Sequence, residues 1–170
     1  PSLQIQLTDP TTLKRPSPDE AEGHPAVVLK HDKRILLYAP GHRSPYFEVQ
    51  EHKVIAIRAE DGFDLAAVKI PTWDESEITN FAARTISPDG VVQEVKKEDL
   101  REDESVYVRG HNTKMRVVHF PSVAVGSILE MAYTVHTPSF RGLFQDNIVD
   151  ELPVREYNLE IQGNNEIRYA

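Results

Sequence analysis

The sequence predicts an all-β fold, an antiparallel β-sandwich of roughly ten to twelve short strands with little helix. Apolar and polar residues alternate at a period of two, which is typical of strands that bury one face. Clusters of Pro, Gly, Asn and Asp separate these runs at regular spacing, as turns do. A helical period of 3.6 is nearly absent. Many short strands separated by turn residues favour a sandwich or barrel.

Size and composition indicate one ordinary globular domain. The 170 residues carry a formal net charge of −8 and no cysteine. An acidic balance argues against a nucleic-acid or anionic-membrane surface, because both need clustered Lys and Arg. The lack of cysteine excludes a disulfide framework and a cysteine nucleophile within these residues. No apolar run is long enough for a membrane span, and the first residues do not resemble a signal peptide.

The chain order predicts two parts. Residues 1–24 predict an N-terminal edge strand or tail followed by a linker, and residues 25–170 a single sandwich domain. Because the chain opens at Pro1 and stops at Ala170 inside a strand-like run, we expect it to belong to a longer polypeptide. Strands are expected at 26–31 and 34–38 (joined by a turn at Asp32-Lys33), and at 46–59, 65–70, 106–108, 115–120, 127–136, 143–149 and 154–162.

The clearest turn is Pro88-Asp89-Gly90, between strand-like runs at 81–86 and 91–95. Pro88 presets φ, the Asp89 side chain can bond nearby backbone, and Gly90 accepts a positive φ. The first run is apolar on both faces, which predicts a central strand. We interpret this hairpin as architectural, since no chemically reactive group lies on the turn.

Two later strands have a predicted inner face. In 127–136 the residues of that face are Leu129, Met131, Tyr133 and Val135, and in 154–162 they are Tyr157, Leu159 and Ile161. Glu130 then lies on the opposite face, in mid-strand. A cross-strand ion pair with Arg84 or Arg116 is the favoured interpretation. A general-acid role is the alternative, but no second carboxylate is placed with Glu130 at glycosidase spacing.

Two motifs, in a fixed order, carry a resemblance to a known family. Ala83 to Gly90 matches an Ala-Arg-(Thr or Val)-Ile-x-Pro-Asp-Gly hairpin, and Pro121 to Tyr133 matches a Pro-x-(Val or Leu)-x-x-Gly-(Ser or Asp)-x-(Ile or Leu)-Glu-x-x-Tyr strand. In these motifs the chain resembles the bacterial domain of unknown function that precedes transglutaminase-like domains. The motif residues are Arg84, Pro88, Asp89, Gly90, Pro121, Gly126, Glu130 and Tyr133.

The resemblance implies an immunoglobulin-like sandwich that is exported, to the periplasm or cell surface, and precedes a transglutaminase- or papain-like domain on the same polypeptide. Transglutaminase chemistry needs a Cys nucleophile activated by His, and this chain has no Cys. We therefore expect a non-catalytic accessory domain without a cofactor. Its expected role is to pack against the downstream domain, to position it or to recruit its substrate. The family supplies no catalytic residues.

Two other functions stay open. Trp73, with Tyr46 and Phe47, would suit a carbohydrate- or peptidoglycan-binding module, because aromatic rings stack on sugars; a core or rim position is the commoner use of a tryptophan. A hydrolase using Glu130 and His136 is the weaker alternative. The ligand considered for such a domain is a glycan or a peptide.

Metal binding is not expected. The seven histidines contain no pair at i,i+2 or i,i+4, and only His119 and His136, with Glu130, suggest a conceivable site on neighbouring strands. The acidic stretches at 74–77, 98–104 and 146–151 lack the residue order of a calcium loop and are expected to be solvated.

Overall fold

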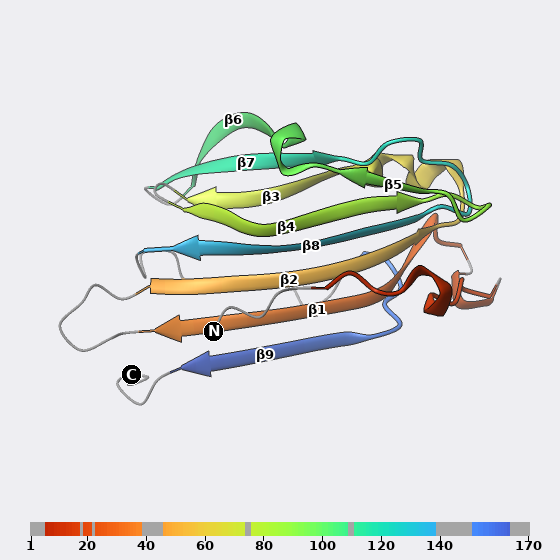
Figure 1. The fold of residues 1–170 in the computed structure, drawn as a ribbon, viewed down its shortest axis with the longest axis horizontal. Coiled ribbons are helices and arrows are strands. Elements are labelled where there is room, and N and C mark those ends of the chain that lie inside the picture. The colour runs from red at the N-terminus through yellow and green to blue at the C-terminus, as the bar shows by residue number, and fades with distance from the viewer. Residues whose placement is uncertain are drawn as a thin grey trace.

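The computed structural model describes residues 6–163 apart from 18, 22, 39–45, 74–75, 109–110 and 139–150, and leaves the side chains of 21, 73, 104–108 and 111–112 undescribed. These residues form nine strands and four 3-10 helices (Figure 1). The strands are β1 (Ala26–Tyr38), β2 (Tyr46–Ile57), β3 (Ala67–Trp73), β4 (Glu77–Ile86), β5 (Val92–Val95), β6 (Arg101–Val108), β7 (His111–His119), β8 (Ile128–Thr137) and β9 (Tyr157–Gly163). The helices are η1 (Pro10–Thr12), η2 (Asp19–Ala21), η3 (Glu60–Ala66) and η4 (Lys97–Asp99).

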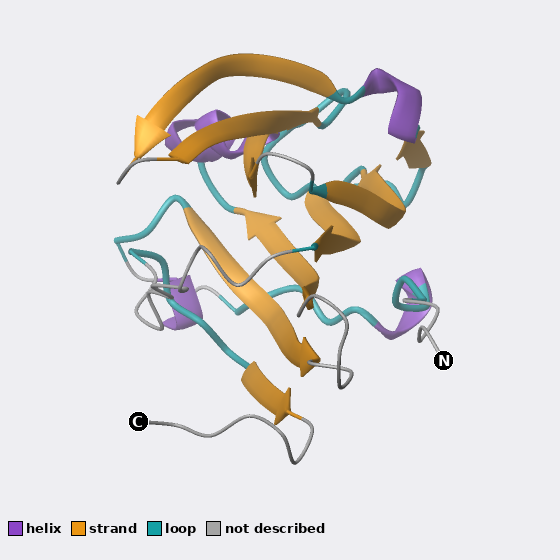
Figure 2. Cartoon of the chain, turned by 90° about the vertical axis from the view of Figure 1, so that its left-hand side faces the viewer, coloured by secondary structure: helices purple, strands orange, loops and turns teal. Residues whose placement is uncertain are grey.

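Two sheets make the sandwich. One has the strand order β5-β4-β8-β2-β1-β9 and the other β3-β7-β6. Every neighbouring pair is antiparallel except β1 and β9, which are parallel. Figure 2 shows the two layers, with the smaller sheet packed over one part of the larger. The predicted all-β sandwich is confirmed, and the strand expected at 143–149 falls outside the described residues. In the described part of the chain no helix is long and apolar enough to cross a membrane.

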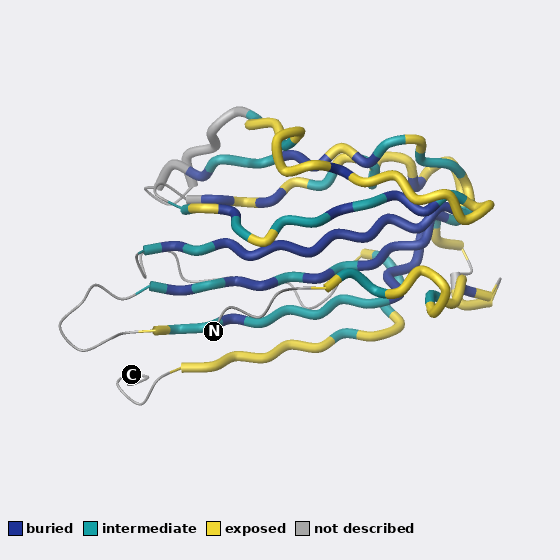
Figure 3. The backbone as a smooth tube through the Cα atoms, viewed as in Figure 1, coloured by how far each residue is buried: buried dark blue, intermediate teal, exposed yellow. Residues whose placement is uncertain are grey.

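The main core lies between the sheets, on what we call the inner face of the six-stranded sheet. Ile55 of β2 and Leu129 of β8 pack there in one cluster with Ile70 of β3 and Val118 of β7. The predicted inner stripe of β8 is confirmed, because Leu129, Met131, Tyr133 and Val135 all belong to this cluster. Figure 3 shows β8 buried along most of its length, as a strand in the middle of a sheet should be.

The outer face of the same sheet carries a second, smaller apolar cluster. Its buried members are Val27, Leu29, Val54, Ala56, Ile86 and Ile128. Leu13 packs against this cluster. Leu13 belongs to residues 6–17, which we call the N-terminal strap; it passes over β1 and β2 in Figure 1. The strap therefore forms part of the packed structure.

Strand β1 corrects the prediction of two short strands with a turn at Asp32-Lys33. The strand runs unbroken from Ala26 to Tyr38 and pairs with β2 throughout, with a register shift between Val28 and Lys30. Asp32 pairs with His52 and Lys33 with Glu51, so both supposed turn residues have favourable cross-strand neighbours. Neither residue supplies the positive φ that a two-residue hairpin needs.

Strand β9 corrects a second prediction. Leu159 and Ile161, expected inside, are 37% and 57% exposed. Their strand is the edge of the larger sheet, next to β1 only. The alternation of β9 identifies its apolar face correctly, but the smaller sheet packs over the other end of the large one (Figure 2). The apolar face of β9 is therefore left uncovered by it.

The β4–β5 hairpin forms as predicted. Ile86 pairs with Val92, and the Ser87 backbone N–H donates to the Val91 carbonyl at 2.9 Å. Gly90 has φ of +89°, as its turn position requires. Strand β4 lies between β5 and β8, so the prediction of an interior strand is correct.

Candidate functional site

The most unusual group in the domain is the Glu130 carboxylate on the outer face of β8. Glu130 is 0% exposed. Its Oε1 lies 2.8 Å from His52 Nε2 and accepts the Thr8 backbone N–H at 2.7 Å. Its Oε2 accepts Arg84 Nε at 2.8 Å and lies 2.6 Å from Arg84 Nη2. The predicted cross-strand pair with Arg84 is confirmed, and Arg84 also donates to the Thr8 carbonyl.

Strand register explains why these groups meet. Arg84 pairs with Glu130, and Glu130 pairs with Val54 of β2. Residues paired across strands share a face, and so do residues two apart along one strand. His52, two residues before Val54, therefore lies on the outer face with Glu130. The strap adds Thr8 from above.

The environment keeps Glu130 ionised. Burial alone would raise its pKa, but hydrogen bonds from His52, from Thr8 and from Arg84 outweigh burial and lower the pKa to about 2. An ionised carboxylate accepts about four hydrogen bonds and donates none, and four donors surround this one. His52 Nε2 must therefore carry the hydrogen it shares with Glu130. A carboxylate so fully engaged is suited to holding structure and poorly suited to exchanging protons with a substrate.

A cleft of about 970 Å³ opens beside this cluster. The strap lines it with Gln6, Leu7 and Thr8, and strands β1, β2 and β9 supply its other walls. The charged and polar lining residues include Lys30, Asp32, Arg34, Gln50, His52, Asn158 and Glu160. The cleft mixes both signs of charge, which suits a zwitterionic or peptide-like ligand better than a polyanion.

Asp32 connects the cleft to the buried cluster. Its Oδ2 lies 2.9 Å from Lys30 Nζ and 3.9 Å from His52 Nδ1, and its Oδ1 accepts Asn158 Nδ2 at 2.9 Å. Burial would raise the pKa of Asp32, but the bonds from Asn158 and Lys30 lower it below its usual value. A chain of polar side chains therefore runs from Lys30 and Asp32 in the cleft through His52 to Glu130.

A second polar cluster lies on the inner face. Tyr133 donates its hydroxyl to Glu51 Oε2 at 2.7 Å, and His31 Nε2 lies 3.0 Å from Glu51 Oε1. Burial would raise the pKa of Glu51, but the bonds from His31 and Tyr133 lower it. The motif residue Tyr133 thus satisfies a carboxylate that the core has partly desolvated.

The other motif residues meet at one end of the sandwich. Gly126 has φ of +88°, and a Cβ placed there would lie 3.4 Å from Pro88 Cγ. Pro121 begins the turn that leads to Gly126. Arg15 of the strap donates to the Ser87 and Pro88 carbonyls at 3.1 Å each. The two motifs, far apart in sequence, are therefore in contact beneath the strap.

Substitution of Gly90 tests how much the positive φ of the turn requires glycine. We expect Gly90→Ala to lower the free energy of unfolding by about 1 kcal/mol, because alanine resists a positive φ; nothing lies within 4 Å of the added Cβ. Gly90→Asn is the matched control and should cost less, since asparagine tolerates the left-handed region. Urea unfolding measures both. Equal losses for the two variants would contradict this account.

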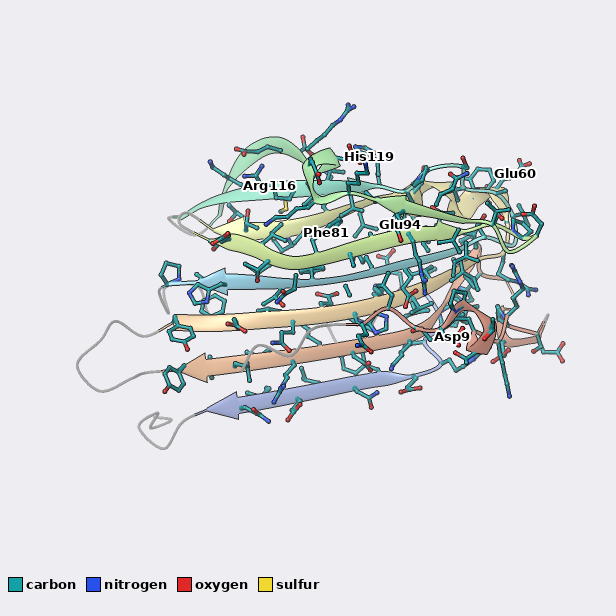
Figure 4. All side chains as sticks on the ribbon, in the orientation of Figure 1. Asp9, Glu60, Phe81, Glu94, Arg116 and His119 are labelled. Carbon is teal, nitrogen blue, oxygen red and sulfur yellow. The ribbon has the colours of Figure 1, made fainter. Side chains whose placement is uncertain are left out.

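The other predicted candidates do not converge with Glu130. His119 ends β7 in the smaller sheet, whereas the strap, marked by Asp9, lies over the larger one (Figure 4). His136 lies six residues along β8 from Glu130, roughly 20 Å at strand spacing, and its Nδ1 is 3.6 Å from Glu48. The two-histidine site and the Glu130–His136 hydrolase pair are therefore wrong in geometry. Among the described residues, no cluster of three or more His, Asp or Glu could hold a metal.

Two further sequence candidates, Arg116 and Phe47, do not take the roles considered for them. Arg116 pairs with Glu102 at 3.0 Å instead of Glu130. Phe47 is 1% exposed and unavailable for sugar stacking, while the Trp73 side chain lies outside the described parts. Residues 74–75 and 146–150 of the acidic stretches also lie outside them.

His52 and Thr8 were not identified from sequence. A lone histidine in an alternating strand has no distinguishing signal. The contact of His52 with Glu130 can be inferred only when Glu130 is placed on the outer face and β2 is known to pair with β8. Thr8 bonds to Glu130 through its backbone N–H and through its side chain, from 122 residues away, and no local pattern reveals that contact.

Comparison with known proteins finds one matching family and similar solved structures. The model of DUF3857, a domain of unknown function with a solved structure, matches residues 47–170. The fold is similar to a crystal structure of a candidate protease from Parabacteroides distasonis, with a TM-score of 0.67 and 16% identity over 83% of this chain. The chain spans 29% of that protein.

Other comparisons add little. An M1 zinc metallopeptidase from Deinococcus radiodurans aligns at a TM-score of 0.30 and 12% identity, over 69% of this chain and 21% of that one, which is too weak for argument. No curated protein matched. The family model covers well over half of the 170 residues, including both motifs. The chain therefore belongs to DUF3857, a family of domains of unknown function.

Proposed function

We propose that this domain is a non-catalytic accessory domain of an exported protein, placed before a transglutaminase- or papain-like catalytic domain that it positions and supplies with substrate. The observation that carries the proposal is the use of the motif side chains. Arg84 and Glu130 bond to each other, and Tyr133 bonds to Glu51. The motif side chains that would have to do chemistry are engaged in holding the sandwich.

The fold comparison supports a role within a larger protein. The Parabacteroides structure contains this fold as less than a third of its length. Its description as a candidate protease fits a neighbour that acts on peptide or amide bonds. At 16% identity the likeness concerns the fold alone, so the nature of the neighbour is part of the proposal.

Edge strand β9 is the surface on which we place the contact with the following domain. It has one free side and exposes Leu159 and Ile161 on one face. It is also the last described strand, so a domain that follows is tethered beside it. Free edges and exposed apolar residues are common docking surfaces.

The test has two stages. The reading frame after Ala170 should encode a domain with Cys, His and Asp, and the isolated 170-residue chain should not cleave or transfer peptide, amide or glycosidic bonds. In the complete protein, Ile161→Lys should lower catalytic turnover about fivefold or more, the effect of losing a buried apolar contact. Val92→Lys, a 40% exposed valine on the opposite edge strand β5, is the matched control and should leave turnover unchanged.

Two results would refute the proposal. One is a reading frame with no catalytic domain after this chain. The other is a Glu130-dependent activity of the isolated chain, which would make the domain an enzyme in its own right.

A further inference from the structure

The sandwich holds the strap by its main chain. Glu130 accepts the Thr8 N–H at 2.7 Å, and Arg84 donates to the Thr8 carbonyl. Arg155 Nη1 donates to the Lys14 carbonyl at 3.0 Å, and Arg58 Nη1 to the Pro16 carbonyl at 2.9 Å. Three arginines and one carboxylate of the sandwich therefore bind main-chain groups of the strap, which every peptide possesses.

Some side chains of the strap also take part: the Thr8 side chain bonds to Glu130, and Pro16 is buried. Leu13 packs against the outer apolar cluster. Arg15 bonds to the Ser87 and Pro88 carbonyls. Lys14 and Ser17 are exposed. We call the outer-face surface that contacts the strap the strap seat. It requires a main chain that makes one 3-10 turn at η1 (Pro10–Thr12), followed by an apolar residue at position 13, a basic residue at position 15 and the buried Pro16.

The seat is also wider than the strap. The cleft of about 970 Å³ runs along Gln6 to Thr8 and is lined on its other side by Asp32, His52 and Asn158. Side chains of a ligand larger than the strap's own can enter it. Its mixed charges match a peptide, which brings both hydrogen-bond donors and acceptors.

We propose that the strap seat is a peptide-binding groove, in which a segment of a partner polypeptide with the same main-chain path replaces the strap. The strap is then an intramolecular competitor that keeps the groove filled until such a segment is available. Tethering gives the strap an effective concentration in the millimolar range, so a free peptide competes poorly with it in the unmodified chain. This goes beyond the accessory role proposed above and does not depend on it.

The test uses a fluorescein-labelled peptide of residues 6–17 and the full 170-residue chain. Leu13→Ala weakens the tethered strap, so the peptide should bind this variant at least about tenfold more tightly than the unmodified chain, in fluorescence anisotropy. Lys14→Ala, which changes an exposed side chain and keeps the carbonyl, is the matched control and should bind like the unmodified chain. Arg15→Ala loosens the strap without touching the apolar cluster and serves if Leu13→Ala does not fold.

Binding of peptides with a changed backbone or with changed side chains tests main-chain recognition directly. A peptide with N-methylated Thr8 lacks the N–H that Glu130 accepts, so it should bind the loosened chain about tenfold more weakly or worse. A peptide with other polar residues at 6, 11, 12 and 14 should bind within about threefold, because the backbone is unchanged. The proposal is overturned if no peptide binds either folded variant at millimolar concentration, or if N-methylation leaves affinity unchanged. It is equally overturned if the loosened chains dimerise by exchanging straps and bind no peptide.

Discussion

Arg84→Met is expected to lower the free energy of unfolding by about 3–5 kcal/mol, because it leaves the buried Glu130 carboxylate without its guanidinium partner. The Arg84 side chain is only 11% exposed and Glu130 not at all, so water cannot replace the lost bonds. Urea unfolding at pH 7 measures the loss. The double variant Arg84→Met with Glu130→Leu should recover most of it, since an apolar pair of similar volume avoids the buried charge.

Arg116→Met is the matched control for this prediction. It makes the same chemical change in the pair with Glu102, where both side chains are about 40% exposed. Exposed pairs contribute about 0–1 kcal/mol, so little should change. If Arg84→Met costs no more than Arg116→Met, the Glu130 cluster does not stabilise the fold as described.

Acid is expected to destabilise the domain through Glu130 between about pH 4.5 and pH 2. The Glu130 carboxyl has an ordinary pKa of 4.5 and a pKa of about 2 in the folded domain, so the unfolded chain takes up the proton first. A lowered folded pKa means that the stabilisation is complete above the unfolded value and is lost as pH falls through the folded one. Protonation of Glu130 therefore lowers the free energy of unfolding by on the order of 3 kcal/mol, at about 1.4 kcal/mol for each unit of pKa difference.

Urea unfolding at steps from pH 6 to pH 2.5 tests this. The unmodified chain should lose stability steeply below pH 4.5. The Arg84→Met, Glu130→Leu double variant lacks the carboxylate and should show a shallower slope over the same range. Glu51 and Asp32, whose pKa values are also lowered, keep some acid sensitivity in both proteins. Parallel curves for the two proteins would show that Glu130 does not contribute the pH dependence.

The candidate site was predictable only in part. The alternation of β8 put Glu130 on the face opposite Leu129, and the neighbouring motif supplied Arg84 as a partner. Both inferences use residues within two strands that pair with each other. His52 is 78 residues from Glu130 and Thr8 is 122 residues away, so their contacts depend on strand order and on the path of the strap. No local pattern contains that information.

By itself the sequence determined what depends on short-range physical chemistry. The preset φ of Pro88 and the positive φ of Gly90 made a hairpin, and period-two alternation made strands with two distinct faces. The tertiary structure alone decided what covers those faces. The smaller sheet leaves Leu159 and Ile161 exposed, the strap seals Glu130, and cross-strand partners keep Asp32-Lys33 in one long strand. The physical reason is that alternation assigns a side to each residue, whereas burial depends on which distant segment packs against that side.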